Sequence, residues 1–391
     1  MFEFYKLSNF ELRYKIVQII SDTDKSLAFE IIAKGLKRAR IDVAYFLLQT
    51  GESDFSLFLK ENDIQYFLIS INGKKSYPLV ILKIYRLLKK LKTTIVHTHL
   101  RDATLLGLIA AKFAGIKHQV YTRHHSTSNH KYYPHAVKWD RLINSLSSHI
   151  VSISKNVSEV LINKENVPNE KLTIIYHGFE LDKFKNPNTS TIIYLKNKYH
   201  IKNDNHPIIG VISRYIHLKG LQYIIPAFAE VKKEYPNSHL ILANAVGNDS
   251  IEIQQLLQSS LNSKDYTEII FEKDLHHLYG IFDYFIHVPI NKEIEAFGQT
   301  YIEALAAKTP SVFTLSGVAT EFIIHEENAL VVPYCSSKAI STSLVRLIKN
   351  KDLCEKIVFN GIKSIQSFSA EEYVKHHINL YNTLCHQKDK K

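Results

Sequence analysis

The first half of the chain alternates short apolar runs with amphipathic stretches. Seven runs rich in β-branched and aromatic residues lie at 15–21, 41–48, 64–71, 93–100, 118–125, 148–154 and 172–178. They are nearly continuously apolar, as parallel strands are when helices cover both faces of their sheet. Helical periodicity fills most of the intervals, for example at residues 25–40 and 101–114. The pattern predicts a series of βαβ units.

A polar stretch at residues 184–207 interrupts this alternation, and we expect it to connect two domains. Six further apolar runs follow at 207–213, 239–246, 267–272, 284–289, 310–315 and 329–334. Helical patterns separate them, and two more close the chain at residues 351–367 and 370–385. We therefore expect an α/β protein of two doubly wound parallel sheets facing across a cleft, with ligands at the carboxyl ends of the strands.

The length of 391 residues exceeds that of one ordinary core, which agrees with two domains. We assign residues 1–188 to a first Rossmann-like domain and residues 189–368 to a second. Residues 369–391 remain as a final helix, for which we consider a return to the first domain.

The three cysteines, Cys335, Cys354 and Cys385, form no CxxC pair or disulfide framework, which indicates a reducing compartment. Residues 1–15 lack the basic start and the apolar run of a secretory signal. A membrane span needs about 18 or more consecutive apolar residues, and the sequence has no such run. We therefore expect a cytoplasmic protein.

Positive charge is concentrated in the first half. Residues 1–185 hold 28 Lys and Arg against 17 Asp and Glu, whereas residues 186–391 hold 21 of each. Within the first half, residues 74–141 carry 14 basic and 2 acidic residues. This excess predicts an anionic partner for the first domain. Nucleic acid has the required charge, but no recognition motif for it occurs, so we expect no nucleic-acid partner.

Glu303 stands in an unusually apolar helical stretch, "TYIEALAA" at 300–307. A helix without a polar face is buried, and a buried carboxylate is costly unless something pairs with it. Eight positions earlier, Glu295 occupies a loop that ends at Gly298, where this helix begins. The N-terminus of a helix suits an anion such as phosphate. Glu303 lies about one nucleoside's reach from that point, so its partner is either a ribose or the protein backbone.

A second loop at the carboxyl end of a strand, "SRYIHLKG" at 213–220, contains Arg214 and Lys219. A diphosphate would need cations in this position. Loop Arg and Lys side chains are more often simply solvated. These two residues point to a diphosphate only in combination with the helix start at Gly298.

Taken together, the motifs resemble those of the retaining family 4 glycosyltransferases, the group 1 transferases of GT-B fold. "EAFGQTYIEALAAKTPSVFT" resembles their Glu-x7-Glu segment, and "SRYIHLKG" is similar to their Gly-Arg-…-Lys-Gly loop. "YHGFELDKF", "LSGVATEFIIHEENALVVP", "VHTHL" and "VYTRHHS" are similar to further landmarks of the family, in the same order. The resemblance covers nearly the whole chain, and it implies a GT-B architecture with the acceptor domain first and the nucleotide-sugar domain second.

The resemblance implies roles for the Glu-x7-Glu segment. Glu295 would contact the donor sugar near the reacting centre. The backbone amides around Phe297, Gly298 and Gln299 would hold the sugar or the diphosphate. Glu303 would bind the ribose of the nucleotide.

It also implies roles for cations and a histidine. Arg214 and Lys219 would neutralise the leaving diphosphate in place of a metal ion, so no metal or other cofactor is expected. Charge that builds on a leaving group is where such sites gain most of their rate. His124 would sit beside the sugar from the first domain, with His125 as the competing choice.

Four departures from the family pattern affect the donor loops. The first loop reads "SDTDKSLAFE" where a Gly-Gly pair is usual, although Lys25 could compensate. Ser213 replaces the glycine before Arg214, Leu218 stands where an acidic residue is common, and Val318 replaces the second glycine after the fifth strand of the second half. None of these changes removes a charge that the site needs.

A basic helical stretch at residues 77–92 combines a wide apolar face with Lys83, Arg86, Lys89, Lys90 and Lys92. It is either a packed helix with a solvated face or a contact with anionic lipid. Residues 131–139 add Tyr132, Tyr133 and Trp139, which suit a bilayer interface. The resemblance implies a glycan or a lipid-linked acceptor in bacterial surface polysaccharide or lipopolysaccharide synthesis. We therefore expect a protein that can be peripheral on the inner face of the cell membrane.

Three alternatives stay open at this point. His97 and His99 form a His-x-His pair after a strand, as in metal hydrolases with barrel folds, although about three strands precede it here. A nucleotide-sugar epimerase would share the GT-B architecture. An inactive binding subunit would keep the fold without turnover.

Overall fold

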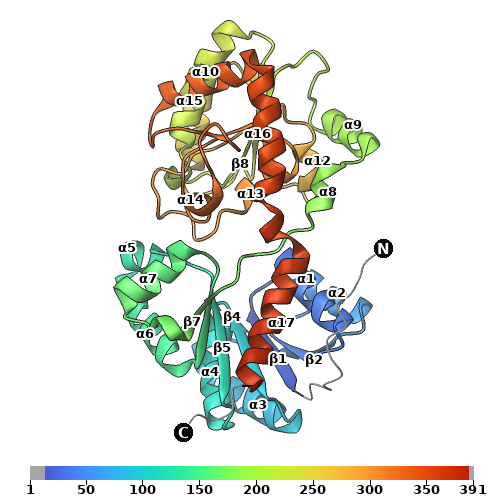
Figure 1. The fold of residues 1–391 in the computed structure, drawn as a ribbon, viewed down its shortest axis with the longest axis vertical. Helices are drawn as coiled ribbons and strands as arrows, with labels where there is room; N and C mark the ends of the chain where they lie inside the picture. Colours follow the sequence, from blue (N-terminus) through green and yellow to red (C-terminus); the bar gives the residue numbers. More distant parts are fainter. Residues whose placement is uncertain (1–13, 387–391) are drawn as a thin grey trace.

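The computed structural model describes residues 14–386. They form two halves, each built around one sheet, with the first sheet in the lower half of Figure 1 and the second in the upper half. No helix among these residues is both long and apolar enough to cross a bilayer.

The first sheet has seven strands, all parallel, in the order β3-β2-β1-β4-β5-β6-β7. Their bounds are β1 Lys15–Ser21, β2 Asp42–Leu48, β3 Gln65–Ile69, β4 Ile95–His99, β5 His118–Arg123, β6 His149–Ser152 and β7 Leu172–Ile174. The second sheet has six, also parallel, in the order β10-β9-β8-β11-β12-β13. Their bounds are β8 Ile208–Ile212, β9 His239–Ala243, β10 Tyr266–Ile269, β11 Tyr284–His287, β12 Ser311–Phe313 and β13 Leu330–Val331.

Helices cover both faces of each sheet. Those of the first half are α1 Leu27–Arg38, α2 Asp54–Glu61, α3 Tyr77–Lys90, α4 Arg101–Phe113, α5 Ser128–Tyr132, α6 Val137–Leu146 and α7 Lys155–Glu165. The others are α8 Leu181–Lys185, α9 Thr189–Lys198, α10 Leu221–Glu234, α11 Ser250–Ser260, α12 Leu275–Tyr279, α13 Gln299–Ala306, α14 Ala319–Phe322, α15 Ser337–Lys349, α16 Lys351–Ser364 and α17 Ala370–His386.

Side chains on the two faces of the first sheet pack into two different cores. In β1, Ile16 and Ile20 pack toward α1 and α17, whereas Val17 and Ile19 pack toward α3 and α4. All four side chains are almost fully buried. The nearly continuous apolar runs therefore correspond to strands that are covered on both faces, as the sequence predicts.

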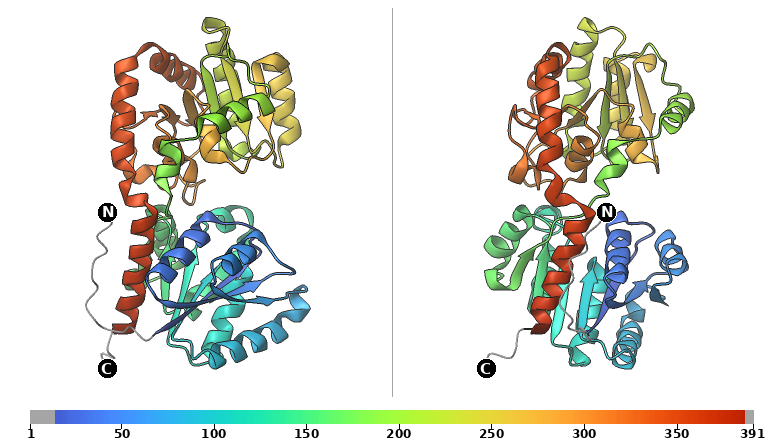
Figure 2. Two further views of the ribbon diagram at one scale, coloured as in Figure 1. Left: turned by 90° about the vertical axis from the view of Figure 1, so that its right-hand side faces the viewer. Right: turned by 45° about the vertical axis from the view of Figure 1, so that its right-hand side comes forward.

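The chain passes between the halves twice. Phe179 N donates to Phe368 O at 2.9 Å, and Ala370 N donates to Phe179 O at 2.9 Å, so the two crossings run side by side. Gly178 makes this possible, because a Cβ there would lie 2.5 Å from the side chain of Tyr373. After the second crossing α17 packs against α1 of the first half, below α16 in Figure 2.

The polar stretch at 184–207 connects the two sheets, as expected, but half of it is helix, in the end of α8 and in α9. Asn188 caps α9, and its side-chain oxygen accepts from the backbone N–H groups of Ser190 and Thr191. Leu195 and Ile201 are buried in a core that also contains Leu278 and Tyr279 of α12. Since α8 and α9 both pack against α12, they lie with the second sheet. The division at residue 188 stays a prediction.

Candidate active site

Glu295 lies in the loop between β11 and α13, and two side chains hold its carboxylate. Lys219 Nζ lies 2.5 Å from Oε1, and His287 Nε2 lies 3.1 Å from the same oxygen. Burial alone would raise the pKa of Glu295, but the hydrogen bond from His287 and the charge of Lys219 outweigh burial and hold the pKa at about 2. Glu295 is therefore ionised at neutral pH.

His287, the last residue of β11, was not singled out from the sequence. Burial lowers the pKa of His287, so the ring is neutral and donates from Nε2 to Glu295. Its other ring nitrogen, Nδ1, is buried without a hydrogen-bond partner in the described part of the chain. The available signal was a histidine at the carboxyl end of the strand that leads into the Glu-x7-Glu loop.

Lys219 and Arg214 lie in the loop after β8, as predicted from the sequence. Gly220 follows Lys219 with a φ of 80° and lets this loop approach β11, because a Cβ there would lie 2.1 Å from Val288 O. Lys219 thereby reaches Glu295. Arg214 is exposed, and its side chain forms no ion pair or hydrogen bond with residues 14–386.

At the start of α13 the backbone packs closely against the ring of Tyr301, and the Thr300 hydroxyl has no partner among the described residues. Gly298 has a φ of 93°, and a Cβ would lie 2.6 Å from the ring of Tyr301. Phe297 is buried and Gln299 is exposed. The amides of the first helical turn have no acceptor within the helix. Among the described residues the buried hydroxyl of Thr300 also has no partner, which the sequence did not reveal.

Glu303 is buried in α13, where its side chain receives one hydrogen bond, from Tyr279 of α12. Tyr279 OH lies 3.0 Å from Glu303 Oε2. Burial raises the pKa of Glu303 to about 7, although the hydrogen bond from Tyr279 opposes this shift. Glu303 therefore has a side-chain partner from the protein and no backbone partner among residues 14–386, and the ribose role stays a prediction.

His124 contacts His177, and His177 in turn contacts Phe297 in the Glu295 loop. The ring of His124 stacks on His177 with a centroid separation of 5.7 Å, and His177 stands edge-on to Phe297 at 5.0 Å. Burial, together with neighbouring imidazoles, lowers the pKa of His124 to about 3. His125 instead turns to Asp140, 3.4 Å away. This arrangement favours His124 over His125 as the histidine near the donor site.

His97 and His99 are buried and hydrogen-bonded to protein groups. His97 contacts Tyr381 OH at 2.7 Å and Thr122 Oγ1 at 2.8 Å, and His99 contacts Gln18 Oε1 at 2.7 Å. Within residues 14–386 no group of three or more His, Cys, Asp or Glu side chains is placed to hold a metal ion. These contacts agree with the structural role for the His-x-His pair.

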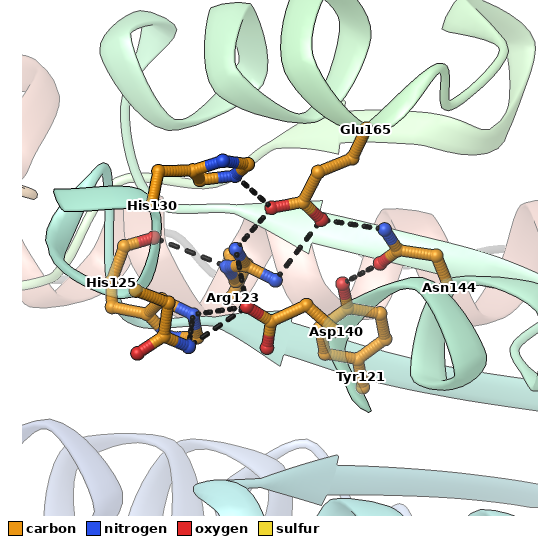
Figure 3. Close-up of polar contacts among 8 residues, drawn as sticks. Tyr121, Arg123, His125, His130, Asp140, Asn144 and Glu165 are labelled. Atoms are coloured by element: carbon orange, nitrogen blue, oxygen red, sulfur yellow. Dashed lines mark hydrogen bonds and ion pairs between the residues drawn. The ribbon is translucent and has the colours of Figure 1, made fainter. Parts of the chain in front are cut away.

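A buried charge cluster next to His124 was missed from the sequence (Figure 3). Arg123, at the end of β5, lies 2.6 Å from Glu165 Oε1 and 3.3 Å from Asp140 Oδ2. Asn144 donates to Glu165, and His130 lies 3.0 Å from it. Arg123 Nε also donates to the backbone oxygen of His125, the residue after His124, at 3.2 Å. We call these groups the Arg123 cluster.

The basic residues of α3 lie apart from Glu295. Figure 1 shows α3 at the end of the first half that is remote from the second sheet. The helix buries Val80, Ile84 and Leu88 and leaves Leu79 72% and Leu82 41% exposed. The five basic side chains, Lys83, Arg86, Lys89, Lys90 and Lys92, are all exposed.

Comparisons with known proteins agree with this geometry. Residues 29–183 match the family described as "Glycosyltransferase Family 4", and residues 195–364 match "Glycosyl transferases group 1". The chain belongs to the family 4, group 1 glycosyltransferases. It is thus a glycosyltransferase that uses a nucleoside-diphosphate sugar as its donor. This agrees with the transferase expected from the sequence.

Two relatives match over most of their length. The chain is 26% identical over 322 residues to the capsular polysaccharide biosynthesis glycosyltransferase CapM of Staphylococcus aureus, covering 80% of this chain and 82% of CapM. It is 27% identical over 360 residues to the alpha-monoglucosyldiacylglycerol synthase of Acholeplasma laidlawii, covering 85% and 87%.

Solved structures confirm the GT-B fold. HepE of Anabaena, solved in complex with UDP-glucose, superposes with a TM-score of 0.79 at 19% identity, covering 94% of this chain and 99% of that one. The lipopolysaccharide outer core galactosyltransferase WaaB gives a TM-score of 0.70 at 14% identity, covering 95% and 99%.

Proposed function

We propose that the protein transfers a sugar from a nucleoside-diphosphate donor to a glycan or lipid-linked acceptor, with retention of the anomeric configuration. The observation that carries this proposal is the meeting of Lys219 with Glu295, 2.5 Å apart, at the start of α13. The loops after β8 and β11 supply the two residues, at the carboxyl ends of neighbouring strands. Ligands of doubly wound sheets bind at such strand ends.

The diphosphate would bind between the start of α13 and the two cations. A lysine ammonium has three donors, so Lys219 keeps two for phosphate oxygens while it holds Glu295. Arg214, exposed and unpaired within the described residues, is free to turn toward the same group. Together they would stabilise the charge on the leaving diphosphate without a metal ion.

The sugar and the nucleoside would lie on opposite sides of that diphosphate. The ionised Glu295 would accept hydrogen bonds from the sugar and stabilise positive charge near its anomeric carbon. Glu303 would accept from the ribose hydroxyls, which agrees with its limited pairing to Tyr279. His124, neutral and close to Phe297 through His177, would contact the sugar from the first domain.

The acceptor side is supported by the charge and the surface of the first domain. α3, α4 and α6 form one layer, and their exposed apolar side chains include Leu79, Phe113 and Trp139. Basic residues flank them, as at Lys89 and Lys90 of α3. Such a surface fits peripheral binding to the anionic cytoplasmic face of a membrane, where each basic residue adds about 1 kcal/mol. The glycolipid product named for the Acholeplasma laidlawii relative and the capsular role named for CapM agree with it.

The test begins with a panel of nucleotide sugars in a thermal-stability assay. A true donor at 100 times its Kd should stabilise the fold by about 2.7 kcal/mol. That donor is then incubated with EDTA, with and without candidate acceptors, and the anomeric configuration of the product is determined by NMR. Product that forms only with acceptor, in EDTA and with retention, supports the proposal; epimerisation without acceptor, or inversion, contradicts it. Binding to anionic but not zwitterionic vesicles, lost in a Lys89→Glu/Lys90→Glu variant, tests the membrane surface.

A further inference from the structure

The backbone that carries Glu295 is held by residues of the first domain. Ser154 Oγ donates to Ala296 O at 2.6 Å, and Asn156 Nδ2 donates to Glu295 O at 2.9 Å. Ser154 is the N-cap of α7 and Asn156 lies in its first turn. Asn156 is only 5% exposed, so this bond is shielded from water. Two consecutive carbonyls of the site loop are therefore bound from the opposite half of the molecule.

The chemistry of Asn156 fixes the direction of its contacts. A backbone carbonyl can only accept a hydrogen bond, so the atom facing Glu295 O must be the NH₂ group of the amide. The same group donates to Ser126 Oγ at 3.1 Å. Ser126 lies two residues after His124, so one side chain joins the Glu295 loop to the His124 loop.

The element that presents Asn156 is itself anchored at both ends. Glu165, the last residue of α7, is bound by Arg123 in the Arg123 cluster (Figure 3). At the other end, the backbone N–H of Lys155 donates to Glu321 Oε1 of the second half at 2.7 Å. A further ion pair, Lys131 with Glu293 at 2.9 Å, joins α5 to the site loop. α7 thus presents Asn156 in a defined position between the two halves.

We infer that Asn156 is a positioning residue for glycosyl transfer: it holds the main chain of Glu295 from the first domain and ties it to the loop of His124. Glu295 then has its working orientation only while the two halves are in contact through α7. This inference rests on the proposed function, because it takes Glu295 as the group beside the donor sugar. Its structural part, the restraint of the Glu295 segment, can be measured without turnover.

A contact with no catalytic consequence would be expected to join surface side chains, as Lys292 and Glu159 do at 4.0 Å. Asn156 instead binds the main chain of the residue that Lys219 and His287 hold by its carboxylate. Glu295 N donates to Ser316 Oγ at 3.0 Å, so the main chain of Glu295 is held at its N–H by the second domain and at its carbonyl by the first. Loss of the Asn156 side chain would leave the Glu295 carbonyl without its bond from the first domain.

The experiment uses the full-length protein with Asn156→Leu, which removes both bonds without adding charge, and Asn156→Asp, which retains only an acceptor for Ser126. Ser158→Ala is the matched control, because Ser158 lies on the same helix and its bond to Ser152 Oγ, 2.6 Å long, stays within the first domain. Hydrogen–deuterium exchange is followed over residues 291–297. Turnover and donor affinity are measured with the nucleotide sugar that gives the largest stabilisation in the panel.

Both Asn156 variants should exchange faster over residues 291–297, and Asn156→Leu should lower kcat about tenfold with less than a twofold change in donor Kd. The control should change neither. Unchanged exchange in both variants, or an unchanged kcat with faster exchange, overturns the inference. If the wild-type protein turns over no nucleotide sugar, the proposed function fails, and the exchange result alone decides whether Asn156 restrains this segment.

Discussion

Two buried ionic clusters lie on either side of the contact between the halves, and they differ in how completely they are paired. In the Arg123 cluster one guanidinium lies between two carboxylates, and Asn144 and His130 add bonds to Glu165. In the Glu295 cluster Lys219 and His287 both bind Oε1, and Oε2 receives no bond from residues 14–386. Nearby, Arg214 and the Thr300 hydroxyl also lack partners in the described chain.

We interpret the Arg123 cluster as stabilising and propose that the groups around Glu295 bind a ligand. Buried polar groups in folded proteins are nearly always paired, so the unpaired His287 Nδ1 and Thr300 hydroxyl need an explanation. The Arg123 cluster satisfies its charges internally and so fixes the shape of the first domain. Around the Glu295 cluster, the first amides of α13, the exposed Arg214 and one carboxylate oxygen have no partner among residues 14–386, and we propose that a nucleoside-diphosphate sugar binds these groups.

The largest expected effect is on stability, from Arg123→Met. This change leaves Glu165 and Asp140 buried without their cation, and removing one partner of a buried ion pair costs about 3–5 kcal/mol. Urea denaturation should show that loss in the free energy of unfolding. Lys292→Met, at an exposed site with a 4.0 Å contact, is the control and should stay within about 0.5 kcal/mol. An equal effect of the two changes would contradict the structural role of the cluster.

The next effect is on catalysis, from Lys219→Met and from Glu295→Ala. Each removes a charge that acts on the reacting groups, and removal of one preorganised group typically lowers kcat about 10²–10³-fold. Their unfolding free energies should change less than that of Arg123→Met, because the Lys219 and Glu295 side chains are less deeply buried than those of Arg123 and Glu165. Steady-state kinetics and urea denaturation on the same preparations check this. Normal rates in both variants would remove the site assignment.

The smallest effect concerns Glu303 and depends on pH. Its pKa in the folded protein is about 7, above the ordinary value of 4.5, so the unfolded chain loses this proton first. The contribution of Glu303 to stability is therefore complete below pH 4.5 and declines as pH rises through 7. Glu303→Gln should be more stable than the wild type at pH 8, on the order of 2 kcal/mol, and nearly equal at pH 4.

Nucleotide binding should show the opposite pH dependence. In the proposed role, ribose hydroxyls would donate to the ionised Glu303, so the Kd of the donor should rise as pH falls below 7 in the wild type and stay level in Glu303→Gln. Calorimetry across this pH range measures it. A parallel pH dependence in both proteins would show that Glu303 does not contact the nucleotide.

Local sequence patterns were sufficient for the strands and for the positions of Glu295, Lys219 and Arg214. Each of these signals lies within one strand–loop–helix unit, where strand ends and helix starts can be read directly. Residues 184–207 were harder, because an amphipathic helix with few apolar residues looks like a linker until its partner helices are known. Leu195 and Ile201 can be recognised as core residues only once the residues that surround them are known.

The Arg123 cluster and the bond from Asn156 to Glu295 could not be predicted in this way. Arg123 and Glu165 are 42 positions apart, and Asn156 and Glu295 are 139 apart. No local periodicity relates them, since their contact depends on how three helices and two domains are placed. His124 and His125 are adjacent in sequence, but only the fold sends one to His177 and the other to Asp140.

The position of α17 has a consequence for the order of folding during synthesis. Tyr373, Leu380 and Tyr381 belong to the core beneath β1, and Tyr381 OH bonds to Gln18 of that strand at 2.8 Å. A nascent chain on the ribosome cannot complete this core until the second sheet has already been translated. Strand β1 is therefore translated first among the strands, but its contact with α17 can form only at the end of synthesis.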